Sequence, residues 1–286
     1  MHFTSYDGAT LAYRRAGSGP PLVCVPGGPG RSPRYLGDLG GLGHSRELIL
    51  PDIRGTGDSE VPADPAAYRC DRIARDVEAL RAGLGLERMD LLGHSAGGNV
   101  ALLYAAAHPE RIRHLILVAP GVRALGLTFT DEEQQAAMRQ RAAEPWFAAA
   151  WAAAQAADGD ESLETTLGYQ PFLYGRWDDT ARAHARAAVS DQAVPVRAGF
   201  YAEGAFDPPA TRAALAALAS PVLVYAGELD AVSPPELLAQ VAGLFPGWAL
   251  TVQPGAGHFP WLDDPAQFAG TLSGFLSGTR RAGGCG

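Results

Sequence analysis

Three residues of the types used in nucleophilic catalysis, Ser95, Asp230 and His258, occur in this order along the chain. Serine is a weak nucleophile near neutral pH, so it needs a histidine to accept its proton. The histidine in turn needs a carboxylate to orient its ring. Serine, acid and histidine in this chain order form one of the known arrangements of such triads. The three residues therefore predict attack on a carbonyl group through a covalent acyl intermediate.

Ser95 lies in a G-x-S-x-G pattern, because residues 93–97 are Gly-His-Ser-Ala-Gly. An apolar run precedes this pattern, and an alanine-rich segment with helical spacing follows it. We expect a strand over about 89–92 to turn sharply into a helix over about 96–107, with the serine at the apex. Side chains at the two flanking glycines would collide with the neighbouring strand and helix. The backbone N–H of Ala96, at the start of the helix, could donate to an oxyanion.

The base and the acid are each expected on a loop that follows a strand. His258 comes directly after the last apolar run, and Asp230 follows the run before it. Reacting groups gather at the carboxyl ends of the strands in open α/β sheets. Glu228 is the local competitor of Asp230 for the role of the acid. Asp52 also follows a strand, but it precedes the serine and is interpreted as a residue that fastens its own loop.

A second donor for the oxyanion is expected from the glycine-rich stretch 27–30 that follows an apolar strand. Glycines allow the backbone to approach a substrate carbonyl closely. We assign the second donor to Gly28, and we expect Gly27 to lie against the substrate.

Apolar runs alternate with helical patterns through most of the chain, which predicts a doubly wound, mostly parallel, eight-stranded sheet. The core is expected over 1–121 and 208–278, and 279–286 is expected to be a disordered tail. The strands are expected within 2–16, which should form a hairpin at Asp7-Gly8, and at 21–25, 48–50, 89–92, 115–118, 221–225 and 249–252. Helices are expected around 73–84, 96–107, 208–219 and 234–244, and from 264 onward.

Residues 122–207 interrupt the alternation, because they contain alanine-rich helical segments and many aromatic residues but no convincing strand. We interpret them as a helical cap that sets specificity, with 168–175 as the first choice for a pocket wall or hinge. The candidate substrate contacts outside the glycine loop are Trp146, Tyr169, Phe172, Tyr174, Tyr201, Glu203 and Phe259.

The chain resembles the α/β-hydrolase superfamily over nearly its whole length. Within it, the segments 27–30, 52–59 and 257–261 are similar to those of the proline iminopeptidase group. The chain differs from that group at Pro26, where histidine is usual, and at Ala96, where tryptophan is common. The group holds the substrate's free amine with cap carboxylates, so the resemblance implies such a role for a residue among Glu203, Glu144 and Asp207.

Composition excludes several classes of function. The chain has 286 residues and a net charge of -8 without a basic block, so nucleic acid is not expected as a partner. Its 23 basic residues are all arginine, which excludes a Schiff-base lysine and a Walker-type phosphate loop. The three cysteines form no metal-binding or disulfide pattern. Without a signal peptide or membrane span, a cytoplasmic protein with no cofactor or metal is expected, acting on a small molecule or short peptide.

The sequence leaves the reaction partly open. The main hypothesis is a serine hydrolase for an ester, amide or small peptide bond. The alternatives with the same triad are acyl transfer, including macrolactone formation or thioesterase-like chemistry, and carbon–carbon bond hydrolysis. A ligand-binding protein of the same fold is less favoured. Carboxylates in the pocket would favour a cationic or free-amine substrate, whereas aromatic and aliphatic groups alone would favour an ester or lactone.

Overall fold

The computed structural model describes residues 1–157, 163–191 and 193–278, so the expected tail at 279–286 lies outside the described residues. Within this part of the chain, one sheet has the strand order β1-β2-β4-β3-β5-β6-β7-β8. Only the pairings of β2, with β1 and β4, are antiparallel. This arrangement confirms the predicted fold class. The strands are β1 (His2–Thr4), β2 (Thr10–Gly17), β3 (Pro21–Val25), β4 (Glu47–Pro51), β5 (Met89–His94), β6 (Ile112–Val118), β7 (Val222–Gly227) and β8 (Ala249–Gln253).

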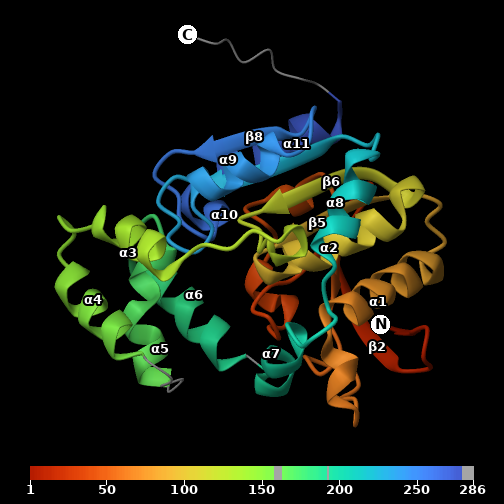
Figure 1. Ribbon diagram of the computed structural model, residues 1–286, viewed down its shortest axis with the longest axis horizontal. Helices are drawn as coiled ribbons and strands as arrows, with labels where there is room; N and C mark the ends of the chain where they lie inside the picture. The colour runs from red at the N-terminus through yellow and green to blue at the C-terminus, as the bar shows by residue number, and fades with distance from the viewer. Residues whose placement is uncertain (158–162, 192, 279–286) are drawn as a thin grey trace.

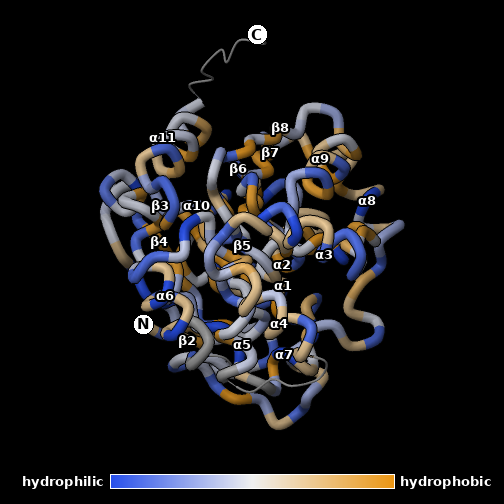
Figure 2. The backbone as a smooth tube through the Cα atoms, turned by 90° about the vertical axis from the view of Figure 1, so that its left-hand side faces the viewer, coloured by the Kyte–Doolittle hydropathy of each residue, from blue (hydrophilic) through white to orange (hydrophobic). Residues whose placement is uncertain are grey.

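Helices cover both faces of this sheet, because the side chains of its central strands are apolar on both sides. In β3, Val23 and Val25 pack into one core cluster, whereas Leu22 and Cys24 pack into the other. This follows from the two-residue period of a strand. In Figure 2 the hydrophobic colour gathers along the inner strands. The first cluster is closed by α1 (Cys70–Gly83), α2 (Ala96–Ala107), α8 (Pro208–Ala216) and α9 (Pro235–Gly243), and the second by α11 (Pro265–Leu276).

The described part of 122–207 contains helices and no strand. Figure 1 shows α3, α4 and α5 standing beside the sheet, while α6 and α7 lead back toward the core. The division into a core domain and a separate cap domain stays a prediction. The helices are α3 (Asp131–Arg139), α4 (Phe147–Ala156), α5 (Leu163–Tyr169), α6 (Asp179–Ser190) and α7 (Val194–Phe200).

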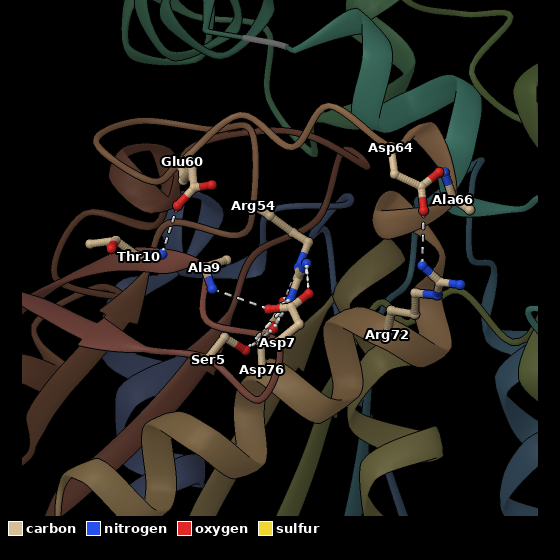
Figure 3. Close-up of polar contacts among 10 residues, drawn as sticks. All are labelled: Ser5, Asp7, Ala9, Thr10, Arg54, Glu60, Asp64, Ala66, Arg72 and Asp76. Atoms are coloured by element: carbon tan, nitrogen blue, oxygen red, sulfur yellow. Dashed lines mark hydrogen bonds and ion pairs between the residues drawn. The ribbon is translucent and has the colours of Figure 1, made fainter.

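The loop that follows β4 is fastened to the rest of the fold by a buried arginine. The Arg54 side chain is 1% exposed. It donates from Nε to Asp76 Oδ2 on α1 at 2.7 Å and from Nη1 to Asp7 Oδ2 at the hairpin turn at 2.7 Å. Ser5 also donates to Asp76. Figure 3 shows these side chains converging between the hairpin and α1. The guanidinium therefore ties three segments that are distant in the sequence.

Replacement of this arginine should destabilise the fold strongly. In Arg54→Met, Asp76 stays buried without its cation, which should cost about 3–5 kcal/mol in free energy of unfolding. Urea unfolding followed by circular dichroism measures the loss. Arg72→Met is the matched control, because Arg72 pairs with Asp64 at 3.3 Å near solvent (Figure 3). Its cost should be below about 1 kcal/mol. Equal losses in the two variants would contradict a dominant role of the buried ion pair.

Candidate active site

Ser95 stands at a strained turn between β5 and α2. Its backbone has φ 51° and ψ -127°, which L-residues rarely adopt. Residues Met89–Val100 are all described, and Ser95 is the single one of them that is not buried. The Ser95 carbonyl accepts hydrogen bonds from Gly98 N at 2.8 Å and Gly121 N at 2.7 Å. The turn thus holds the hydroxyl-bearing residue out of the core, as expected for an elbow.

Three glycines around this turn have no room for a side chain. A Cβ on Gly93 would lie 2.6 Å from Gly97 O, and one on Gly97 would lie 2.5 Å from Pro26 O. A Cβ on Gly27 would lie 2.6 Å from Ser95 Cβ. The ends of β3 and β5 and the start of α2 therefore approach one another closely. This contact brings the glycine-rich loop after β3 directly beside Ser95.

The predicted acid lies on the loop that follows β7, the predicted base lies on the loop that follows β8, and their side chains are in contact. His258 Nδ1 lies 2.8 Å from Asp230 Oδ2, and both side chains are buried. The other carboxylate oxygen, Oδ1, accepts from Val232 N at 2.8 Å and Ser233 N at 3.1 Å. Because the carboxylate can only accept, Nδ1 carries the proton and Nε2 is left with its lone pair. His258 and Ser95 line the same cavity.

The two competing carboxylates have other contacts. Glu228 is exposed and accepts from Gly255 N at 2.7 Å. Asp52 accepts from Asp58 N at 3.2 Å and from Ser32 Oγ at 3.1 Å, so it ties its own loop to the residues that follow the glycine-rich stretch. Neither carboxylate contacts the His258 ring.

Gly28 and Ala96 both line the cavity at Ser95. Gly27 cannot offer its N–H to a substrate, because it donates to the Tyr35 hydroxyl at 2.7 Å. The N–H groups of Gly28 and Ala96 donate to no residue in the described ranges. Of the two neighbouring glycines, Gly28 is thus the one whose N–H remains available for an oxyanion.

A buried histidine beside the serine links the glycine-rich loop to His258. The Nε2–H of His94 donates to the carbonyl of His258 at 2.9 Å. Its Nδ1 therefore accepts from the Tyr35 hydroxyl at 2.7 Å, and that hydroxyl accepts from Gly27 N–H. Burial, and next the proximity of His258, hold the pKa of His94 well below its ordinary value. A neutral hydrogen-bond chain thus connects the two loops.

The neutral state of His94 should make the fold sensitive to acid. Its pKa in the folded protein lies below the unfolded value near 6.5, so the unfolded state binds the extra proton first. Its contribution to stability is present above pH 6.5 and is lost as the pH falls toward the folded pKa. In His94→Gln the slope of unfolding free energy against pH should be shallower by up to about 1.4 kcal/mol per pH unit.

Urea unfolding between pH 5 and pH 7.5 checks this slope. His184 also has a lowered pKa, mainly through burial, so part of the slope should persist in the variant. His44→Gln replaces an exposed histidine and is the matched control. The same pH slope in wild type and His94→Gln would contradict the proposed neutral state.

Ser95 lines two chambers. The larger, of about 270 Å³, extends toward α3 and α7, and the smaller, of about 180 Å³, extends toward α5. Ser95 and Gly28 line both. Tyr201 borders the larger chamber, and Tyr169 borders the smaller one. Three residues of the segment 168–175, Tyr169, Gln170 and Leu173, line the smaller chamber. Leu173 O also accepts from His258 N at 2.7 Å.

The other predicted substrate contacts do not line these chambers. Phe172, Tyr174 and Phe259 are fully buried, and the sequence could not distinguish such core aromatics from pocket aromatics. Trp146 packs edge-on against Phe172, with ring centroids 5.2 Å apart. Their large apolar surface is used to pack the cap and its junction with the His258 loop.

The three carboxylates proposed to hold a free amine do not line either chamber. Glu203 is exposed and borders neither chamber. Glu144 pairs with Arg141 at 3.1 Å, and Asp207 caps α8 by accepting from Ala210 N at 3.1 Å. Asp207 followed by Pro208 is a helix-start signal that the sequence does carry.

The structure adds chamber residues that sequence reasoning missed. Asn99, one turn into α2, accepts from Ala124 N through Oδ1, and its buried Nδ2 has no partner among the described residues. Gln170 and Arg31 border the smaller chamber, and each has one buried polar atom without such a partner, Oε1 and Nε respectively. Only Arg31 had a sequence signal, because it follows the glycine-rich loop directly.

Within the described ranges, no helix is long and apolar enough to cross a bilayer. The same ranges contain no group of three or more His, Cys, Asp or Glu side chains that could hold a metal ion.

Comparisons with known proteins agree with this architecture. Residues 20–265 match the family model of the alpha/beta hydrolase fold. An uncharacterized protein of Mycobacterium tuberculosis is 30% identical over 99% of this chain and 82% of its own length. A proline iminopeptidase of Lactobacillus helveticus is 39% identical over 121 residues, 41% of each chain. The crystal structure of an esterase from Rhodococcus sp. ECU1013 is 26% identical, with a TM-score of 0.77 over 98% of this chain and 99% of that chain.

Proposed function

The chain belongs to the α/β-hydrolase fold family, and we propose that it is a serine hydrolase that cleaves esters or lactones. The observation that carries the proposal is the hydrogen bond from His258 Nδ1 to the buried Asp230, with Ser95 at an elbow in the same cavity. An oriented imidazole beside an exposed serine is what nucleophilic catalysis requires.

In the proposed mechanism, the Ser95 hydroxyl attacks the substrate carbonyl while His258 Nε2 takes its proton. Asp230 holds the ring in the required tautomer and stabilises the imidazolium that forms. The N–H groups of Gly28 and Ala96 donate to the oxyanion of the tetrahedral intermediate. The imidazolium then protonates the leaving alcohol, and a water molecule activated by the same histidine hydrolyses the acyl-enzyme.

The charges around the cavity favour an ester or lactone over a free-amine peptide. Among the described residues, those that line the two chambers include arginines but no aspartate or glutamate. A substrate ammonium group would find no opposite charge there, and burying an unpaired charge is costly. The similarity to a proline iminopeptidase covers 41% of the chain, so it does not by itself carry amine recognition over to this chain.

Ser95→Ala should abolish turnover of a simple ester such as 4-nitrophenyl butanoate. Loss of the nucleophile lowers kcat by about 10⁴-fold or more in other triads. A fluorophosphonate probe should label Ser95, as peptide mass spectrometry can establish. Ser45→Ala, at an exposed serine, should keep full activity and labelling. Unchanged turnover in Ser95→Ala would exclude the mechanism.

The expected lack of preference for a free amine can be tested with two substrates that differ in one charge. Proline methyl ester carries a free amine, and N-acetylproline methyl ester does not. We expect kcat/KM for the acetylated ester to equal or exceed that for the free amine, measured by methanol release. A preference of about tenfold or more for the free amine, about 1.4 kcal/mol, would instead support an iminopeptidase.

A further inference from the structure

Arg31 brings a positive charge to the edge of the catalytic cavity. It follows the glycine-rich loop, and its backbone N–H donates to Gly27 O at 3.3 Å, which fixes it near Gly28. Its side chain lines the smaller chamber together with Ser95 and His258. It also lines an open outer groove of about 800 Å³. Arg31 is therefore shared by the linings of the smaller chamber and of this groove.

This arginine has no ion-pair partner within the described ranges. Other arginines near the core are paired, as Arg46 is with Asp90 at 3.0 Å and Arg54 is with Asp76. Arg31 is partly buried, and its Nε is buried without a hydrogen-bond acceptor. Two carboxylates, Asp38 and Asp191, line the outer groove, and neither forms an ion pair with Arg31. A buried donor left unpaired is costly, and an acceptor group on a bound ligand would satisfy it.

A second side chain in the same chamber is also unsatisfied. Gln170 is 2% exposed, and its Oε1 has no partner among the described residues. Thr166 and Tyr169 add hydroxyl groups to the same wall. Arg197 lines the chamber as well, so the lining has two arginines and several polar groups, which is unlike a purely apolar acyl pocket.

We propose that Arg31 binds a carboxylate group of the substrate, so that the preferred esters or lactones carry an acidic group on the side of the smaller chamber. The planar guanidinium suits a carboxylate, because two parallel N–H donors match its two oxygens. This inference rests on the proposed serine hydrolase function, since Ser95 and His258 define the reacting end of the same chamber. Arg31 acts here as a specificity-determining residue and takes no part in bond cleavage.

Matched substrates that differ in one negative charge test the proposal. Monomethyl glutarate and dimethyl glutarate share an acyl skeleton, and methanol release measures the turnover of each. The rate for dimethyl glutarate is halved, because it carries two equivalent ester groups. The second pair is 4-acetoxybutanoate and its methyl ester. Here the charge of 4-acetoxybutanoate lies on the leaving group, and acetate release measures the turnover of both compounds. In at least one pair, the charged ester should have the higher kcat/KM by about 10- to 100-fold, the range of hydrogen bonds to charged groups.

Variants assign this preference to Arg31. Arg31→Gln should lower kcat/KM for the charged ester by about 10- to 100-fold and leave the neutral ester within about twofold. Arg31→Lys should recover part of the preference, because it keeps the charge but loses the planar fork. Arg34→Gln is the matched control, since Arg34 is exposed and lines only the outer groove. Retained turnover of the neutral ester shows that each variant is folded.

The outcomes separate this proposal from the one on which it rests. Turnover that depends on Ser95 but shows no preference for charge in either pair would overturn the carboxylate subsite and leave the serine hydrolase intact. A preference that survives in Arg31→Gln would also overturn it. Absence of any turnover that depends on Ser95 would overturn both proposals.

Discussion

The close contact of three backbone segments at the elbow is the constraint on which the rest of the site depends. The end of β3, the end of β5 and the start of α2 meet at Gly93 and Gly97, where a Cβ would collide with backbone atoms. Ser95 can reach its positive φ only because this packing holds the turn in place. The same contact sets the glycine-rich loop beside the serine, so the candidate nucleophile and the candidate oxyanion donors are positioned together.

Hydrogen bonds between uncharged groups then link the glycine-rich loop, the elbow and the loop that carries the candidate base. Gly27, Tyr35 and His94 form a chain that ends on the carbonyl of His258. The amide of His258 is held in turn by Leu173 O in the cap segment. In a buried environment a neutral histidine can serve as both donor and acceptor without the cost of desolvating a charge. The cap segment that walls the smaller chamber is thereby fixed to the candidate base.

The charged residues that line the chambers differ in sign from the net charge of the chain. The chain is acidic overall, with a net charge of -8, yet the described residues that line the two chambers include arginines and no carboxylate. Within 122–207, Glu144 pairs with Arg141 and Asp207 caps a helix, so both carboxylates have structural roles. This distribution of charge is the basis of the two proposals on specificity, which expect a neutral or anionic substrate.

The sequence by itself determined the order of strands and helices, the elbow around Ser95 and the identity of the candidate acid and base. These signals are local: apolar runs, helix-start residues and glycines at fixed offsets follow from backbone geometry within a few residues. It could not separate Phe172 and Phe259 from pocket aromatics, because an apolar ring suits a core and a pocket equally well. Only the tertiary structure decided that His94 is a buried connector, that Glu203 is remote from the cavity and that Arg31 has no ion-pair partner in the described chain. The physical reason is that burial, pairing and cavity lining depend on contacts between segments far apart in the chain, and no local pattern encodes those contacts.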